Sequence, residues 1–249
     1  MSLMQYYTIM TQAIYIVGNQ GLGDQLVLNG LYRYLALRYE FCVIAIGNRY
    51  KSILKDMLKD VKNIYVCGYR MEFWEPNIYA HRNLLKAAGF VTLSLGEFGL
   101  KSFESSTNSL DENLYRQAQI PHEVRWSKFS YKRNPQKEKS LYNRLGCDLG
   151  PYIFLHEDSS RGYKIREDLL PSGINIIRPD PKLKGFSFFD YLGVMENALE
   201  IHSIESSFAI LAEQMDLKNQ KFAHRYARPE VASNQKLWYS FRSHWNILA

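Results

Sequence analysis

Long apolar runs, an export signal and paired cysteines are all missing from this chain of 249 residues. No stretch reaches the roughly 18 apolar residues of a membrane-spanning helix, and the opening residues lack the basic start of a signal peptide. The three cysteines, Cys42, Cys67 and Cys147, are odd in number and have no CxxC spacing. We therefore expect buried thiols in a reducing compartment, and a protein of the cytoplasm.

Metal-binding motifs are missing as well. The sequence has no HEXXH, no paired Cys/His set and no Asp-x-Asp, so we expect neither a metal nor a cofactor. The 31 Lys and Arg against 25 Asp and Glu give a net charge of +6, without a run of five basic residues. This balance suits an anionic partner: a nucleotide diphosphate, an acidic membrane surface or a nucleic acid. Charge alone does not choose among them.

The first part of the chain alternates between short apolar runs and segments with helical spacing. This alternation predicts a parallel sheet with right-handed crossovers. The predicted elements are strands at 13–17, 41–46, 63–67 and 91–95, and helices at 24–39, 49–61, 76–90 and 110–119.

A basic helix or linker between residues 130 and 149 divides the chain, and we place the domains at 1–140 and 141–249. The second part repeats the α/β alternation. The expected fold class is α/β, with two Rossmann-like domains whose parallel sheets face a cleft, where ligands usually bind. The predicted elements here are strands at 152–155, 174–177 and 199–201, and helices at 188–198 and 206–215.

Gly18, Gly21 and Gly23 lie between the first strand and the first helix, where glycine allows a sharp turn and close approach of a ligand. Their spacing is GxxGxG, whereas dinucleotide sites have GxGxxG. The second strand ends in Gly47-Asn48, without an acid to hold a ribose. An NAD-dependent oxidoreductase is therefore disfavoured.

Asp24 follows this turn at the start of the helix. The helix dipole stabilises a carboxylate there, but the same carboxylate would repel a phosphate. The residue by itself leaves two interpretations open: a helix-capping residue, or an ionised base that faces the cleft.

The segment from His156 to Lys164 (HEDSSRGYK) follows the first strand of the second half. Arg161 offers a planar fork and Lys164 a mobile charge, a combination that suits diphosphate oxygens. A solvated loop with internal salt bridges to Glu157 and Asp158 is the alternative. Arg178 ends another strand, at a cleft mouth or on a solvated rim.

A second candidate anion site lies where a strand gives way to the helix at 206–215. Ser206 or Ser207 can cap this helix, whose first amides are free to bind an anion. The Glu205 carboxylate could accept hydrogen bonds from both hydroxyls of a ribose. His156 and His202 could reach the phosphates or the acceptor, although a lone histidine beside a strand is often structural.

The segment GLGDQLVLNGLYRYLA resembles the opening motif of GT-B glycosyltransferases of the lipopolysaccharide heptosyltransferase type. In that family a Gly-x-Gly-Asp turn ends the first strand, and its Asp is the proposed general base. The resemblance implies that Asp24 deprotonates the acceptor hydroxyl and that Gly21 and Gly23 lie on the substrate side.

Two later segments resemble the same family in the same order. Ser160, Arg161 and Lys164 match its Thr-Ser-Arg-Asp-Asp-Lys segment, with Gly162 and Tyr163 in place of the two acids. The segment that begins at Glu205 is similar to the Asp-Ser-x-x-x-His-Leu-Ala region of heptosyltransferases and of O-linked N-acetylglucosamine transferase. In this chain Glu stands for Asp, and Ile or Leu for His.

The resemblance implies a metal-independent glycosyltransferase that moves a sugar from a nucleoside-diphosphate sugar to a hydroxyl of a glycan or lipid-linked acceptor, in glycan or surface-polysaccharide synthesis. The donor would bind mainly to the second domain. We expect no nucleic-acid partner, and contact with a membrane surface stays open. The short chain and the substituted motifs leave an alternative: a non-catalytic nucleotide-binding protein with a reduced glycosyltransferase fold.

Overall fold

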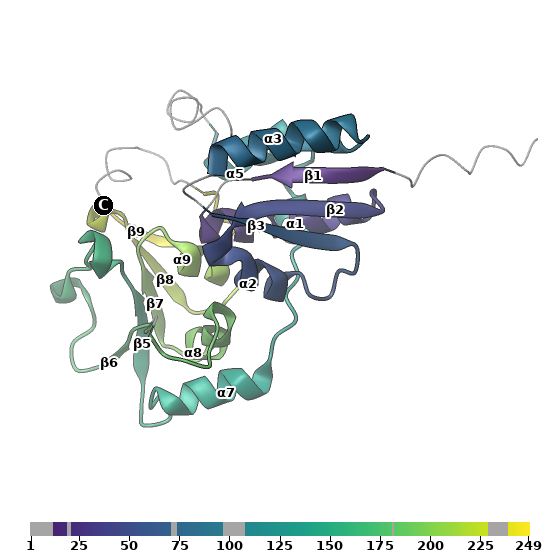
Figure 1. Cartoon of the computed structure of the whole chain (residues 1–249). Helices are drawn as coiled ribbons and strands as arrows, with labels where there is room; N and C mark the ends of the chain where they lie inside the picture. The colour runs from purple at the N-terminus through teal and green to yellow at the C-terminus, as the bar shows by residue number, and fades with distance from the viewer. Residues whose placement is uncertain (1–11, 19–20, 71–73, 97–107, 181, 229–238) are drawn as a thin grey trace, which may run out of the picture. The chain divides into compact units, whose positions relative to one another are not determined.

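The structure is a computed structural model that describes residues 12–18, 21–70, 74–96, 108–180, 182–228 and 239–249. The chain divides into two compact units, Met1–Tyr131 and Lys132–Ala249 (Figure 1). Each unit has its own sheet, and all strand pairs of both sheets are parallel.

The sheet of the first unit has the strand order β3-β2-β1-β4. Its central strands are continuous apolar runs because helices cover both of their faces, as in α/β proteins. The strands are β1 (Ala13–Val17), β2 (Phe41–Gly47), β3 (Ile64–Tyr69) and β4 (Val91–Ser94).

The central helix of the first unit, α1 (Leu22–Ala36), is buried along most of its length. Gly30 on this helix lies against the backbone of the short helix α6 (Val124–Ser127), and an added Cβ would lie 2.3 Å from the carbonyl oxygen of Val124. Only glycine therefore allows the two helices to pack so closely. The other helices are α2 (Asn48–Met57), α3 (Trp74–Ala87) and α5 (Leu110–Gln117).

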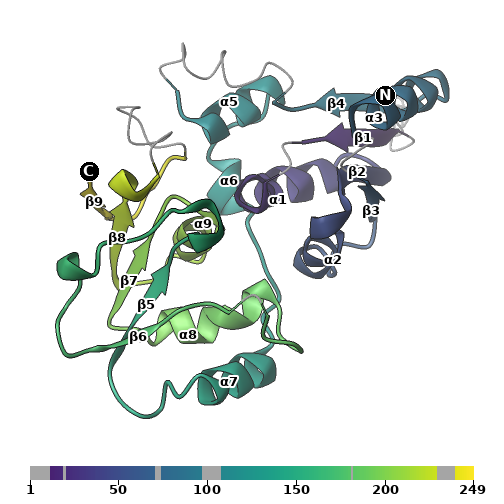
Figure 2. The ribbon, with the colours of Figure 1, turned by 60° about the vertical axis from the view of Figure 1, so that its left-hand side comes forward.

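The sheet of the second unit has the order β6-β5-β7-β8-β9. The unit begins with α7 (Pro135–Arg144), which packs against α8 (Leu192–Glu196) and the 3₁₀ turn η4 (Phe188–Tyr191) (Figure 2). The strands are β5 (Tyr152–His156), β6 (Asn175–Ile177), β7 (Glu200–Ser203), β8 (Gln220–His224) and β9 (Asn246–Leu248). The remaining helical segments are η2 (Ser159–Arg161), η3 (Glu167–Leu169), α9 (Ser207–Gln214) and η5 (Arg225–Ala227).

The prediction of two parallel α/β sheets is confirmed. Among the described residues, the helix α6, the strands β8 and β9 and the short 3₁₀ segments η2, η3 and η5 were not predicted. The predicted helix at 188–198 is instead a 3₁₀ turn followed by α8, because Ser187 and Asp190 form a capping box that starts a separate turn. The polar composition of residues 97–109 predicts a loop, and residues 97–107 of this segment lie outside the described residues.

The compact units divide between Tyr131 and Lys132, within the region 130–149 where the sequence places the domain boundary. A division after residue 140 would pass through α7. In the described ranges, no helix is long and apolar enough to cross a membrane.

Candidate functional site

Three strands of the second unit end in polar residues at the same edge of the sheet. His156 ends β5, Ser203 ends β7 and His224 ends β8, and the strand register pairs His156 with Ser203. The carboxyl ends of parallel strands are where open α/β sheets bind ligands. A buried cluster of Leu155, Ile165, Ile204 and Ala227 holds the loops at this edge in place.

Ser206 is the N-cap residue of α9, but its hydroxyl does not cap the helix. Its Oγ lies 2.8 Å from Nδ1 of His156 and 3.1 Å from Oγ of Ser203. Ser203 donates its only hydroxyl proton to the carbonyl oxygen of Ile204, at 2.8 Å. Ser206 therefore donates to Ser203 and accepts from the N–H of His156, whose Nε2 keeps its lone pair.

The first-turn amides of α9 point to the same place, because Ser206 leaves them without a side-chain cap. The N-terminus of a helix with free amides and a positive dipole end is a ready anion site. The ring of His156 lies beside it, 4.7 Å from the ring of Phe208 on α9. Burial lowers the pKa of His156 to about 4, so the imidazole is neutral near pH 7.

The charged side chains of the loop after β5 pair with one another. Asp158 accepts hydrogen bonds from Oγ of Ser160 and Nε of Arg161, both at 2.6 Å, and Gly162 closes the turn with φ +78. Burial alone would raise the pKa of Asp158, but these two donors lower it below its usual range. This is the internal salt bridge that the sequence left as an alternative. Exchanging Asp158 for a phosphate would free Arg161, whose side chain is 53% exposed.

Lys164 and Arg178 take different positions around this loop. Lys164 is exposed and has no ion-pair partner in the part of the chain that the structure describes. The exposed Arg178 donates to Oε1 of the exposed Glu167 at 2.6 Å and lies 4.0 Å from the more buried Glu157. Arg178 is thus part of a solvated rim.

Glu205 is buried, with its Oε2 3.7 Å from Nε of Arg225. Its backbone oxygen accepts a hydrogen bond from Arg228 at 2.8 Å. The carboxylate is directed into the unit in this structure, which suits a structural charge pair. Its contact with a ribose stays a prediction.

His202 lies inside the second unit, and both of its ring nitrogens have partners. Nε2 lies 2.8 Å from the Glu200 carboxylate, and Nδ1 lies 2.9 Å from Nε2 of His224. The ring also stacks on Phe222 at 4.5 Å. His202 is therefore a satisfied structural histidine, and the geometry does not support its predicted contact with a ligand.

The contacts of His202 belong to a longer chain of hydrogen bonds. Nδ1 of His224 lies 2.9 Å from the hydroxyl of Tyr226, which accepts from the backbone N–H of Arg166 at 3.0 Å. The Glu200 carboxylate only accepts, so the protons of the neutral rings all point toward it. Burial lowers the pKa of His202, and it lowers that of His224 to about 4, which keeps both rings neutral.

The glycine turn of the first unit confirms the capping role of Asp24, in a different position from the one expected. Gly21 is the N-cap residue, and Asp24 at the third helical position accepts the Gly21 N–H through Oδ2 at 2.9 Å. A Cβ at Gly21 would lie 2.7 Å from that oxygen, and the φ of Gly21 is −75. Gly21 is needed for close approach of the carboxylate. Gly23 lies in the same first turn.

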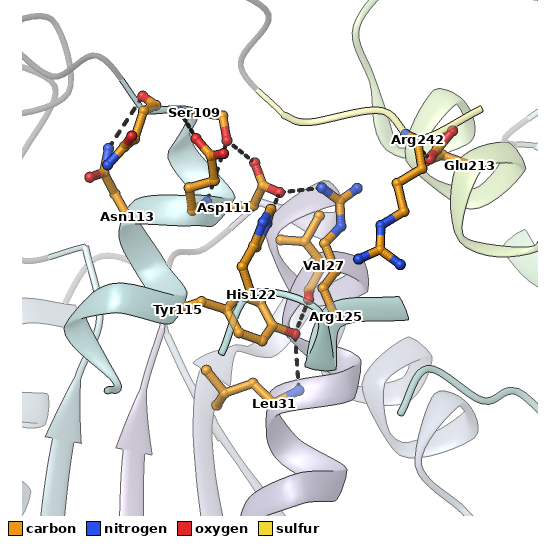
Figure 3. Close-up of polar contacts among 12 residues, drawn as sticks. Val27, Leu31, Ser109, Asp111, Asn113, Tyr115, His122, Arg125, Glu213 and Arg242 are labelled. Carbon is orange, nitrogen blue, oxygen red and sulfur yellow. Dashed lines mark hydrogen bonds and ion pairs between the residues drawn. The ribbon is translucent and has the colours of Figure 1, made fainter. Parts of the chain in front are cut away.

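A buried ionic network beside α1 was not predicted. Asp111 and Arg125 are fully buried and form an ion pair, and Asp111 also accepts from His122 and Ser109 at 2.6 Å each (Figure 3). Burial would raise the pKa of Asp111, but these donors and the Arg125 charge lower it to about 2. The only local signal is the capping box of Ser109 and Glu112, which marks a helix start but none of the distant partners.

Tyr115 fixes this network to α1. Its hydroxyl donates to the carbonyl oxygen of Val27 at 2.8 Å and accepts from the N–H of Leu31 at 3.1 Å (Figure 3). The ring lies 5.5 Å from that of His122. Helices α1 and α5 and the His122 ring are therefore held as one block in the first unit.

The two parallel sheets with interleaved helices match the fold of solved GT-B glycosyltransferase structures. The chain is similar to a glycosyl transferase family 9 protein from Veillonella parvula DSM 2008, with a TM-score of 0.58 and 10% identity, over 96% of this chain and 88% of that one. It is also similar to ADP-heptose lps heptosyltransferase II of E. coli, with a TM-score of 0.53 and 11% identity, over 95% and 90%.

Comparison of the sequence with protein-family models gives no match, and no curated protein matches it. The resemblance to heptosyltransferases is confirmed at the level of the fold. At identities of 10% and 11%, the likeness does not extend by itself to activity.

Proposed function

We propose that the chain is a glycosyltransferase that uses a nucleoside-diphosphate sugar as donor. The observation that carries this proposal is the uncapped N-terminus of α9 beside His156, at the carboxyl edge of the second sheet. The fold supports it, because one similar structure is of a protein named for ADP-heptose.

In this proposal the donor diphosphate is held by the first amides of α9 and by His156. Arg161 and Lys164 extend from the neighbouring loop and add positive charge, Arg161 by exchanging Asp158 for a phosphate oxygen. These groups stabilise the negative charge that develops on the leaving diphosphate without a metal ion. Arg178 contributes only to the potential at the rim.

Asp24 is the proposed base on the acceptor side. As the acceptor oxygen forms its bond to the anomeric carbon, the Asp24 carboxylate takes the hydroxyl proton. The bond between the anomeric carbon and the diphosphate oxygen breaks, and its electron pair leaves with the diphosphate. The acceptor is a glycan or lipid-linked hydroxyl.

The anion site can be tested by removing one amide without removing the helix. Ser207 is the first residue of α9, where proline is well tolerated because that N–H has no partner within the helix. Ser206 before it has extended backbone angles, φ −147 and ψ 177, as a residue before proline requires. Ser207→Pro should weaken diphosphate binding about tenfold, a loss of roughly 1.4 kcal/mol.

Ser207→Ala is the matched control, because it removes the hydroxyl and keeps the amide. Titration calorimetry with UDP, GDP, CDP and ADP gives the affinities, and thermal melting reports folding. Absence of binding to all four diphosphates would overturn the proposed function. Binding without sugar transfer from any donor would instead favour a non-catalytic nucleotide-binding protein.

A further inference from the structure

The second unit has a groove of about 760 Å³ between α7 and the segment that follows Asp180. It is not part of the anion site at α9, and none of its lining residues has a role in the proposed reaction. The lining residues are Ser140, Asn143, Arg144, Asp180, Lys182, Leu183, Lys184 and Phe186.

Four cations gather at this groove. Arg144, Lys182 and Lys184 line it, and Nζ of Lys137 lies 3.5 Å from the carbonyl oxygen of Gly185, the residue between the lining residues Lys184 and Phe186. All four side chains belong to exposed residues. Within the described ranges, none of the four forms an ion pair with a carboxylate. The single lining carboxylate, Asp180, accepts from the backbone N–H of Lys182 instead.

Several other cations of the second unit form ion pairs. Arg133, which precedes α7, binds both Glu138 and Glu196, and Arg178 binds Glu167. Exposed pairs also join Arg161 to Asp158, Arg166 to Asp168 and Lys218 to Asp216. Lys132, Lys139 and Lys164 are also exposed and form no ion pair in the described ranges, but around the groove four such cations lie together, and an external anion can supply the missing partner.

The groove combines this charge with apolar side chains. Leu183 and Phe186 line it, and Leu149, in the loop after α7 but not among the lining residues, is 83% exposed. From Lys137 to Arg144 the cations extend about 10 Å along the helix, so they do not converge on one point. Basic residues beside exposed apolar side chains are typical of surfaces that lie against a membrane.

We propose that α7 and the segment 182–186 form a docking surface for the headgroups of an anionic phospholipid membrane. The spread of the cations fits several headgroups at once better than one small phosphate ligand. Arg144 lies in the last turn of α7, where the negative end of the helix dipole disfavours an anion bound against the backbone. Headgroups at a surface contact only the tips of the long side chains.

The test is binding to vesicles of phosphatidylcholine with one quarter phosphatidylglycerol, measured by co-sedimentation of the full chain. The quadruple variant Lys137→Gln, Arg144→Gln, Lys182→Gln, Lys184→Gln removes four charges from exposed positions. The control variant Lys55→Gln, Lys62→Gln, Lys86→Gln, Lys128→Gln removes four from exposed positions of the first unit. Both variants carry the same net charge, so they separate the groove from the total charge of the protein.

Each basic residue near such a surface contributes roughly fivefold to the partition coefficient. We expect the groove variant to lose binding several hundred-fold and the control variant to bind like the wild type within about fivefold. Wild-type binding should vanish with pure phosphatidylcholine, and also in about 0.5 M salt, because screening removes the attraction. Thermal melting of both variants checks that they fold.

Three results would overturn the proposal. The wild type binds no anionic vesicles, or both variants lose binding equally, or the wild type prefers duplex DNA to vesicles at equal phosphate concentration and the groove variant loses the DNA. None of these readouts depends on sugar transfer, so the docking surface and the proposed reaction stand or fail separately.

Discussion

Ser206 turns its hydroxyl away from the helix that it begins and toward Nδ1 of His156, 2.8 Å away. A capping residue that does not cap leaves the helix amides for another acceptor. The contact also determines which nitrogen of His156 carries the proton, since Ser206 has only one proton of its own to donate.

Diphosphate binding should be coupled to proton uptake by His156. Burial lowers the pKa of this imidazole to about 4, and a bound dianion beside it raises that value because it favours the charged ring. The complex then holds more protons than the free protein, so the affinity for diphosphate should increase as the pH falls from 7 to about 5. Calorimetry in Tris and in MOPS at one pH gives the number of protons taken up. Binding enthalpies that are equal in the two buffers, once the heat of dilution is subtracted, would contradict the prediction. His156→Ala should abolish the proton uptake.

One substitution can distinguish the capping role of Asp24 from its proposed catalytic role. Asp24→Asn keeps an oxygen that can accept the Gly21 N–H, so the melting temperature should stay nearly unchanged. It removes the carboxylate that would take a proton, so sugar transfer should fall by at least about a hundredfold. Diphosphate affinity serves as the internal control and should not change. Full transfer by the variant would show that Asp24 only caps the helix.

Gly21→Ala should destabilise the first unit through the same contact. The new Cβ would lie 2.7 Å from Oδ2 of Asp24, which forces the carboxylate away from the helix end. Loss of this cap should cost about 1 kcal/mol of the free energy of unfolding. Urea unfolding measures the loss. In the Asp24→Ala background the same change should have almost no further effect, and an additive loss would contradict this account.

The buried pair of Asp111 and Arg125 should dominate the stability of the first unit. Asp111→Asn leaves the fully buried guanidinium without its counter-charge, which should cost about 3–5 kcal/mol. Asp168→Asn, which breaks the exposed pair with Arg166, is the control and should leave the urea midpoint unchanged. Similar midpoints for the two variants would mean that the buried charge is relieved by another route.

The second unit should lose stability in mild acid. The pKa values of His156, His202 and His224 are all lowered, so the unfolded chain binds protons at these sites more readily than the folded one. Their contribution is complete above the unfolded pKa of about 6.5 and is lost as the pH falls toward 4, by up to roughly 1.4 kcal/mol per pH unit for each ring. Urea midpoints at several pH values measure the slope. It should be shallower in His224→Gln, and an unchanged slope would contradict the assignment.

The sequence predicts most of the framework because strand and helix periods are local signals. Ala13–Val17 has the predicted bounds, and β5 differs from its predicted range only by His156. Strand β9 was missed because three residues, Asn246–Leu248, carry no periodicity, and they become a strand only by pairing with β8. Register of that kind is a tertiary property.

The candidate site was predictable in position but not in its pairing. The sequence places His156, Arg161 and Ser206 at strand ends, and the structure brings His156 and Ser206 into contact. The salt bridge of Arg161 and Asp158 is one of two alternatives that the sequence leaves open. No spacing rule shows that both nitrogens of His202 are occupied. Such contacts depend on strand order and side-chain direction, which a single sequence does not reveal.

The hydrogen bonds from Arg166 through Tyr226, His224 and His202 to Glu200 all run in one direction, since each group donates to the next. Replacing one histidine strands a nitrogen on its neighbour, whereas replacing both can restore a consistent interior. The effects of substitutions at positions 202 and 224 on stability are therefore coupled. Across related chains we expect the two positions to be retained together or exchanged together, and seldom to drift alone.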